Sequence, residues 1–283
     1  RRLDGVEELF TEYLIRNNLR ESLKQIYDFQ RLMGRIAYGN ANGKDLIALR
    51  NSLAELPNIK DELSNTSSDI LRDIDSKIHD FNEIYDRIDR AISEDAGFTI
   101  KEGGLIKDGY SKELDDLKFS IKDGKEWISS LEQKERERTG IKTVKVGFNK
   151  VFGYYIEVSK SFVDQVPEDY IRKQTLTNGE RYITDELKDM EATILGAKDK
   201  LYSLEYELFC GIRDKLSENS KRLLSAASIL AKLDSYLSLA TVASRNRYVC
   251  PEVDASDVID IREGRHPVVE QYIKDFQGTV IIV

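Results

Sequence analysis

Two stretches of regularly spaced apolar residues, separated by about fifty residues, constrain the fold of this chain more than any other feature. The first stretch advances in steps of three and four through Leu114, Leu117, Ile121, Gly124, Ile128 and Leu131. The second keeps the same rhythm through Leu187, Met190, Ile194, Ala197, Leu201, Leu204 and Leu208. This spacing is typical of helices that pack side by side along a heptad seam. We therefore predict an antiparallel coiled coil with the intervening residues at its tip.

The predicted coiled coil would form a long arm. Two helices of about 30 residues, at 1.5 Å per residue, would reach about 45 Å from the rest of the molecule. Such an arm is suited to act as a lever, because a small rotation at its base becomes a large displacement at its tip. The heptads alone favour a structural coiled coil, which could bind a protein partner, and the small domain at the tip is what favours a lever.

The insert between the heptad stretches changes its period from helical to alternating. Apolar residues occupy every second position from Val144 to Phe148 and again from Tyr154 to Val158, which predicts two strands. The residues between them, Asn149 to Gly153, are the expected connection. We therefore expect a small β-rich domain at the tip of the arm, at about 139–184.

The remaining chain is predicted to be mainly helical. Residues 3–91 have helical spacing, interrupted by expected turns at 38–43 and 56–58, with Asp45 as a helix N-cap and an irregular excursion from Gly97 to Gly109. Val258–Ile261 and Thr279–Val283 are predicted strands of a further domain. The fold class is thus a mainly α helical bundle with a lever arm and a β-rich tip. The expected domains are 1–123 (first part of the helical core and lever), 124–185 (tip), 186–248 (returning helix and core) and 249–283 (beginning of another domain).

The charge distribution points to the tip as a binding surface. The net charge of −8 argues against a nucleic-acid partner, but residues 139–184 carry seven cations and five acids, a net charge of +2, so the remainder carries −10. Donor side chains in this segment are suited to contact phosphate oxygens without reading bases. The candidate contacts are Lys145, Lys150, Arg172, Lys173, Thr175, Asn178 and Arg181. Composition equally allows a reading in which the aromatics are a small core and the charges a solvated surface.

Catalytic and ligand-binding patterns are weak throughout the chain. Neither histidine lies in an HExxH motif or in a pattern typical of a catalytic triad. The sequence also contains no GxxxxGK[ST] phosphate loop. The two cysteines, Cys210 and Cys250, lack metal-ligand spacing and are expected to be buried thiols. We therefore expect no enzyme, cofactor or metal in these residues. The sequence shows no apolar run of the roughly 20 residues that cross a membrane, so we expect a cytoplasmic protein.

Several consecutive segments resemble the MutS family of bacterial DNA mismatch-repair proteins. ERERTG (135–140), KVGFN (145–149) and FGYYIE (152–157) resemble the entry to the family's DNA-gripping domain, called the clamp. PEDYIRKQTL (167–176) and ERYIT (180–184) resemble its exit, and EGRHPVVE (263–270) resembles the approach to the family's ATPase domain. The resemblance spans almost the whole chain, including its helical N-terminal part.

The resemblance implies a function for each part of the chain. The clamp would contact the backbone of double-stranded DNA without sequence preference, and the lever helices would couple clamp position to mismatch recognition and to ATP state. The family's mismatch reader and Walker-type ATPase have no counterpart in these residues. Because the chain begins with Arg rather than Met and stops inside a β-branched run, we expect both ends to be cuts. ATP, magnesium and a second MutS subunit would belong to the full-length protein, which would act in the cytoplasm at the nucleoid.

Overall fold

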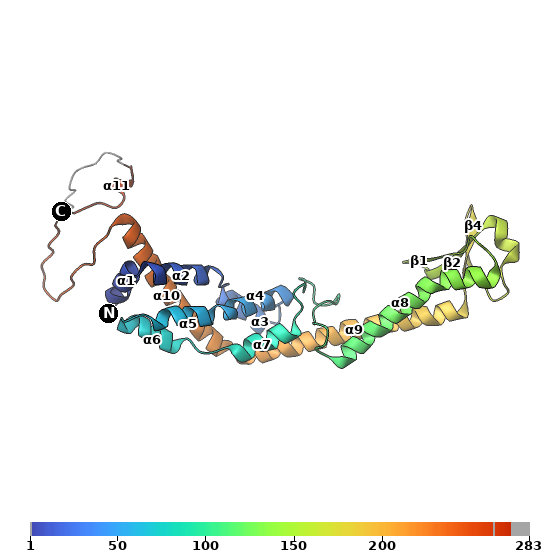
Figure 1. The fold of residues 1–283 in the computed structure, drawn as a ribbon, viewed down its shortest axis with the longest axis horizontal. Coiled ribbons are helices and arrows are strands. Elements are labelled where there is room, and N and C mark those ends of the chain that lie inside the picture. The colour runs from blue at the N-terminus through green and yellow to red at the C-terminus, as the bar shows by residue number, and fades with distance from the viewer. Residues whose placement is uncertain (1, 263, 273–283) are drawn as a thin grey trace.

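The computed structural model describes residues 2–262 and 264–272, and it is an elongated molecule with three parts (Figure 1). A helical body at one end is connected by a two-helix arm to a small sheet at the other end. The body helices are α1 (Arg2–Thr11), α2 (Tyr13–Lys24), α3 (Phe29–Ala37), α4 (Gly43–Ala54), α5 (Leu56–Ser64), α6 (Asp69–Lys77), α7 (Asn82–Ala91) and α10 (Ser220–Asn246). The predicted mainly α class is confirmed.

The body is built around α10, which packs against α1, α2, α3 and α6. By length and composition, α10 is apolar enough to cross a membrane, which the sequence analysis did not anticipate. However, Leu223, Leu233 and Ala240 on its inner face are completely buried in the apolar cluster of the body. One face of α10 thus belongs to the core of the bundle, while Leu224, Leu239 and Val242 on the same helix are exposed.

Two details of the body helices differ from the sequence prediction. The expected turn at 38–43 is confirmed, but the N-cap of α4 is Asn42, and Asp45 is the N3 residue that completes a capping box with it. No turn occurs at 56–58, because α5 begins at Leu56 with Pro57 in its first turn. Proline is tolerated there because the first N–H groups of a helix have no intrahelical partner.

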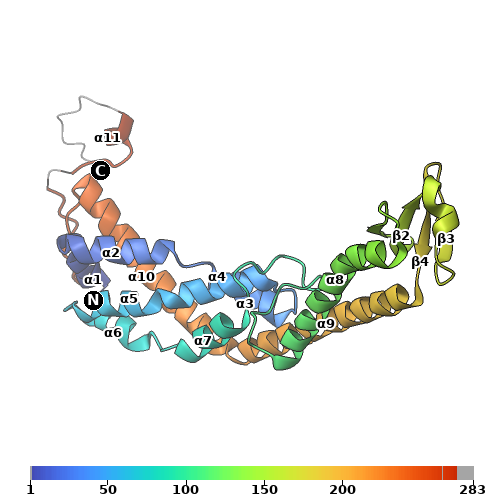
Figure 2. The same ribbon diagram turned by 45° about the vertical axis from the view of Figure 1, so that its right-hand side comes forward.

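The arm consists of α8 (Lys112–Thr139) and α9 (Asp185–Glu218), which pack against each other in antiparallel directions (Figure 2). Ser111 and Thr184 cap the two helices, and Gly140 ends α8 in a left-handed conformation with φ of 73°. A Cβ atom on Gly124 would lie only 2.7 Å from the side chain of Ile194. The missing side chain therefore lets the helices approach closely.

The buried face of α9 departs from the predicted seam after Leu201. Leu204 and Leu208 are only half-buried, whereas Glu205 and Phe209 are buried completely or almost so. The cause is a change of partners, because the second half of α9 packs against α3 and α7 in the body. Leu114 at the start of α8 also belongs to the body cluster. The free arm is therefore shorter than the predicted length of about 45 Å.

The tip is a four-stranded antiparallel sheet in the order β1-β2-β4-β3. Its strands are β1 (Lys145–Asn149), β2 (Gly153–Ser159), β3 (Ile171–Thr175) and β4 (Gly179–Ile183), with a 3-10 helix, η1 (Lys160–Gln165), after β2. The predicted hairpin is confirmed as β1 and β2, while β3 and β4 were not predicted. Ile156, Val158 and Tyr182 lie on the face that packs against α8 and α9.

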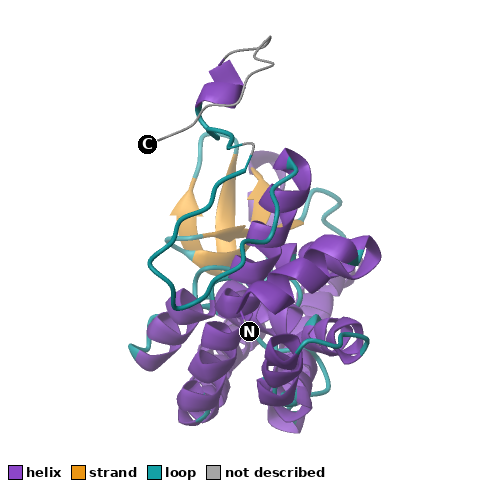
Figure 3. Cartoon of the chain, turned by 90° about the vertical axis from the view of Figure 1, so that its left-hand side faces the viewer, coloured by secondary structure: helices purple, strands orange, loops and turns teal. Residues whose placement is uncertain are grey.

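The apolar core of the molecule is divided into two clusters. One fills the body, and the other joins the inner face of the sheet to Ile128 and Leu131 of α8 and to Leu187 and Ile194 of α9. Figure 3, viewed from the body end, shows the strands gathered in one group while helices make up the body. The predicted domain boundaries stay a prediction, although the tip cluster extends along α9 beyond residue 185.

The C-terminal part of the described chain differs from the prediction. Residues 258–261 are exposed and form no strand, because no neighbouring strand among the described residues pairs with them. A short helix, α11 (Val269–Tyr272), follows, and the predicted strand at 279–283 lies outside the described residues. The expectation of buried thiols is also wrong, since Cys210 is half-buried and Cys250 is exposed.

Candidate nucleic-acid interface

The strand register brings three lysines of the tip to one end of the sheet. This is the end at which β1 and β4 begin and β2 ends. Two contacts join the chain there: the Ser159 hydroxyl donates to Thr143 Oγ1 at 2.9 Å, and the Lys160 N–H donates to the Asn178 carbonyl at 3.0 Å. Lys142, Lys145 and Lys160 are exposed there, and none forms an ion pair with a residue that the structure describes. We call these three residues and the adjoining segment 175–178 the lysine end.

The turn between β3 and β4 adds neutral donors to the lysine end. The Leu176 N–H donates to the Gly179 carbonyl at 2.8 Å and closes the hairpin. A Cβ atom on Gly179 would lie 2.4 Å from the Val158 carbonyl oxygen, so glycine is required where β4 meets β2. The side chains of Thr175 and Asn178, both predicted contacts, are exposed beside this turn. Hydroxyl, amide and ammonium donors are thus combined at one end of the sheet.

Arg181 lies on the outer face of the sheet and is largely engaged within the tip. Its Nε donates to Glu157 at 2.9 Å and its guanidinium to Gln174 at 3.1 Å. The same group lies 4.1 Å from the centre of the Tyr155 ring. Because these contacts cross β2, β4 and β3, Arg181 holds the outer face together, and its charge is already paired.

The other predicted cations lie away from the lysine end or are paired. Arg172 forms a 3.4 Å ion pair with Glu180, which also accepts from the Tyr182 hydroxyl at 2.7 Å. Burial, reinforced by this hydrogen bond, raises the pKa of Tyr182 to about 12. The Lys173 ammonium donates to the Phe152 carbonyl at 3.1 Å, and Lys150 lies on the exposed turn after β1. The seven predicted residues therefore do not form one cluster.

The opposite end of the sheet, where β4 runs into α9, is acidic. A cleft of about 430 Å³ is lined there by Lys134, Glu135, Arg138, Glu168, Asp169, Ile171, Thr184, Asp185 and Glu186. Glu135 is 3% exposed and accepts from Arg138 at 2.7 Å and from the Tyr170 hydroxyl at 2.9 Å. Burial and this hydrogen bond raise the pKa of Tyr170, and the carboxylates of Glu135 and Asp169 raise the pKa of Arg138. The tip therefore has a basic end and an acidic end.

The turn between β1 and β2 exposes apolar side chains. Val151 is 81% exposed, and Phe148 and Phe152 are also exposed, with the Phe148 ring 4.9 Å from that of Tyr154. The alternative reading, in which the insert's aromatics are only a small core, therefore fits Tyr154, which packs against the tip cluster, but not Phe148 or Phe152.

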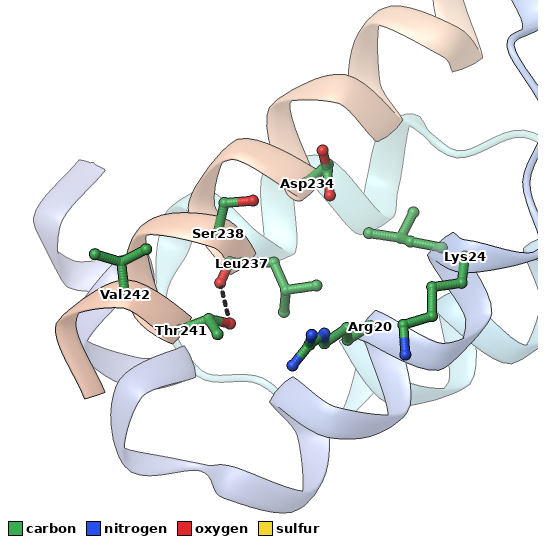
Figure 4. Close-up of a pocket in the computed structure, with 8 residues that line it drawn as sticks. Arg20, Lys24, Asp234, Leu237, Ser238, Thr241 and Val242 are labelled. Carbon is green, nitrogen blue, oxygen red and sulfur yellow. Dashed lines mark hydrogen bonds between the residues drawn. The ribbon is translucent and has the colours of Figure 1, made fainter. Parts of the chain in front are cut away.

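The described residues contain no group of three or more His, Cys, Asp and Glu side chains arranged to hold a metal ion. The clefts of the body are open grooves. Figure 4 shows one of about 350 Å³ between α2 and α10, lined by Arg20 and Lys24 on one side and by Asp234 and Thr241 on the other. The Thr241 hydroxyl is used within its own helix, since it donates to the Leu237 carbonyl at 2.7 Å.

Sequence reasoning missed two members of the lysine end. Lys142 and Lys160 were counted in the positive segment but were not selected as contacts. The usable signal for Lys160 was its position two residues after the alternating run that ends at Val158. Placing it beside Asn178 requires the β2–β4 pairing, which is a contact between residues distant in the sequence.

Comparisons with known proteins agree with this architecture. The description "MutS family domain IV" matches residues 109–200, which include α8, the whole sheet and the first part of α9. The chain is 50% identical over 272 residues, or 96% of its length, to the DNA mismatch repair protein MutS of Acetivibrio thermocellus. It is 49% identical over 273 residues, again 96%, to that of Clostridium perfringens. The chain spans 31% and 30% of these two relatives. Together with the resemblance of the tip segments, these matches show that the chain belongs to the MutS family.

Proposed function

We propose that the tip grips double-stranded DNA by its sugar–phosphate backbone, without sequence preference, as part of a MutS-type DNA mismatch-repair protein. The observation that carries this proposal is the lysine end, where Lys142, Lys145 and Lys160 are exposed and unpaired with any described residue. Ammonium groups of this kind replace the counterions of DNA phosphates, which supplies most of the affinity in nonspecific binding.

The neutral groups of the lysine end support backbone contact rather than base reading. The exposed side chains of Thr175 and Asn178 are donors that contact phosphate oxygens and fix the position of a protein on a duplex. Base reading uses a helix or a two-stranded ribbon laid in the major groove, whereas the lysine end consists of strand ends and a turn. The acidic end would repel the duplex, and so would favour one orientation of the tip.

The arm and the remaining parts of a longer protein complete the proposal. As a lever, α8 and α9 would connect the position of the tip to events in the body, and in the full-length protein to mismatch recognition and to ATP and magnesium binding. A second MutS subunit would supply a second tip. Because the net charge of −8 opposes DNA binding, we expect this chain alone to bind weakly and the linkage of several contacts to add affinity.

The test is binding of a fluorescent 30-base-pair duplex, followed by anisotropy at low and at physiological salt. We expect the Lys142→Ala/Lys145→Ala/Lys160→Ala variant to lose at least tenfold in affinity at low salt, since each phosphate contact contributes to counterion release. The matched control is Lys125→Ala/Lys188→Ala/Lys200→Ala, which removes the same charge from exposed positions on the arm. Equal losses in the two variants would contradict a localised interface.

A structural role without DNA contact is the alternative, and the exposed apolar turn at Phe148, Val151 and Phe152 is the observation that favours it. A protein partner held by this turn would give binding that depends little on salt, whereas phosphate contact weakens steeply with salt. Loss of a protein contact in a Val151→Ser/Phe152→Ser variant, with DNA binding unchanged, would favour the alternative.

A further inference from the structure

A buried carboxylate lies where the arm joins the body. Glu205 of α9 is 1% exposed, and its Oε2 accepts a hydrogen bond from the Leu105 N–H at 3.1 Å. Its Oε1 accepts no hydrogen bond from a described residue, and the nearest cation is the Lys118 ammonium at 3.8 Å. Burial of a charged group is costly unless oppositely charged groups and donors surround it. The Leu105 N–H and the Lys118 ammonium must therefore stay close to the Glu205 carboxylate.

Lys118 connects this carboxylate to two other parts of the molecule. It lies on α8, and its ammonium donates to Asp108 at 2.6 Å and to the Ile106 carbonyl at 3.3 Å. One ammonium group thus contacts both arm helices and the segment 92–111, which connects α7 of the body to α8.

The segment 92–111 is itself fixed to both neighbours. Within the segment, the Ser93 N–H donates to the Leu105 carbonyl at 2.9 Å, and on the body side the Lys107 N–H donates to the carbonyl of Ala91, the last residue of α7, at 2.9 Å. On the arm side, Gly103 has φ of +84°, and a Cβ atom there would lie 2.7 Å from the Tyr202 ring. Close contact with α9 and tight pairing with the end of α7 therefore leave this segment little freedom.

We propose that Glu205 and Lys118 form a joint that fixes the direction in which the arm leaves the body. The apolar contacts around them are non-directional and tolerate small rotations. The polar contacts are directional, because a rotation of α9 would remove the Leu105 N–H and the Lys118 ammonium from a carboxylate that water does not reach. Glu205 and Lys118 are positioning residues in this proposal, and neither contacts DNA.

The arm contains a matched control for this pair. Lys134 of α8 and Glu186 of α9 also form an ion pair between the two helices, at 3.4 Å, but both side chains are 56% exposed. Water replaces a lost partner at such a site, so its removal has little effect. Burial and connection to the segment 92–111 are the features that distinguish the joint from this pair.

The experiment uses double electron–electron resonance on the whole chain to measure the distance between the tip and the body. Nitroxide labels are attached at Ser161→Cys on η1 and Asp61→Cys on α5, both exposed, in a Cys210→Ser/Cys250→Ser background. We expect Lys118→Met and Glu205→Gln each to broaden the distance distribution. The double variant should broaden it no further, because both changes break one pair. Lys134→Met should leave the distribution as narrow as in the parent.

Hydrogen exchange at the Leu105 amide provides a second readout that does not depend on labels. We expect exchange to become about tenfold faster or more in a Glu205→Leu variant, since the amide loses its buried acceptor. If that variant does not fold, Lys118→Met and Glu205→Gln keep the acceptor oxygen and still test the joint. Faster Leu105 exchange with an unchanged distance distribution would overturn the proposal. The measurement uses no DNA, so its failure is distinct from failure of the proposed function.

Discussion

The body and the tip of this molecule are held together in different ways. In the body, helices pack around α10, and the apolar cluster draws residues from every helix from α1 to α10. In the tip, four strands of five to seven residues bury only one face, and they obtain that burial from α8 and α9. A sheet of this size needs a covering layer to be stable. The arm helices α8 and α9 therefore form part of the apolar core of the tip, in addition to connecting the tip to the body.

Two substitutions on α9 test most directly whether the body and the tip are stabilised separately. Ile194 and Ile212 of α9 are both 4% exposed, the first in the tip cluster and the second in the body cluster. We expect Ile194→Ala and Ile212→Ala each to cost about 2–5 kcal/mol, because each leaves a cavity. Hydrogen exchange should show loss of protection in the sheet for Ile194→Ala and in the body for Ile212→Ala. Identical patterns would mean that the two clusters unfold as one unit.

Removal of a buried hydroxyl group from the tip should have a smaller effect. Tyr170→Phe removes the hydroxyl that donates to the buried carboxylate of Glu135, which retains its contacts with Arg138. We expect a loss of roughly 1–3 kcal/mol, measured by chemical denaturation and confined to the tip. Tyr236→Phe, in a half-buried tyrosine of the body, is the control and should change stability far less.

Alkaline pH should weaken the tip before the body. The pKa of Tyr182 is raised by burial to about 12, from about 10 in the unfolded chain. The folded state holds this proton more tightly, so the stabilisation is complete below pH of about 10 and is lost as the pH rises towards 12. Protection of the sheet amides from hydrogen exchange should therefore decrease between a pH of about 10 and about 12, and Tyr182→Phe should make this decrease smaller. An unchanged pH dependence in that variant would contradict this origin.

Acid should act on the body side instead. Hydrogen bonds from Arg50, and secondarily from Lys107, lower the pKa of Glu94 from 4.5 to about 2. The stabilisation is therefore present above pH of about 4.5 and is lost as the pH falls towards 2. Since Glu94 is largely exposed, we expect a small effect, visible as faster exchange in the segment 92–111. Glu94→Gln should remove this acid sensitivity without affecting the sheet.

The smallest effect should come from the exposed ion pair between α8 and α9 in the acidic cleft beside the sheet. Lys134→Ala breaks its contact with Glu186, and both side chains are more than half exposed. We expect a change of about 0.5 kcal/mol or less, which decreases further at high salt. A thermal unfolding series in salt measures it, and a loss above about 1 kcal/mol would show that this pair contributes to the core of the tip.

The parts of this fold that depend on local sequence could be predicted. The helical spacing, the antiparallel pair and the β1–β2 hairpin all follow from periodicity over neighbouring residues. The sequence did not reveal where α9 changes partners, because the burial of Glu205 in place of Leu204 depends on α3, α7 and the segment 92–111. The β-branched residues at 258–261 resembled a strand, but a strand needs a neighbour to pair with.

The candidate site was predicted by region and only partly by residue. Donor chemistry selected Lys145, Thr175 and Asn178, which the structure brings to the lysine end. The same chemistry selected Arg181, whose pairing with Glu157 follows from the β2–β4 register and has no trace in the local sequence. Whether any of the seven residues contacts DNA stays a prediction. Strand pairing, which the local sequence does not show, decides which partners a cation of the sheet finds.

The measurement that most directly tests the central claim is the salt dependence of duplex binding by the tip. The slope of log affinity against log salt changes by about 0.9 for each phosphate contact. If Lys142, Lys145 and Lys160 contact phosphates, replacing all three by alanine should make the slope shallower by about 2 to 3, and the arm control should keep the parent slope. A parent slope retained by the lysine-end variant, or lost equally in the control, would contradict the claim that this end of the sheet grips DNA.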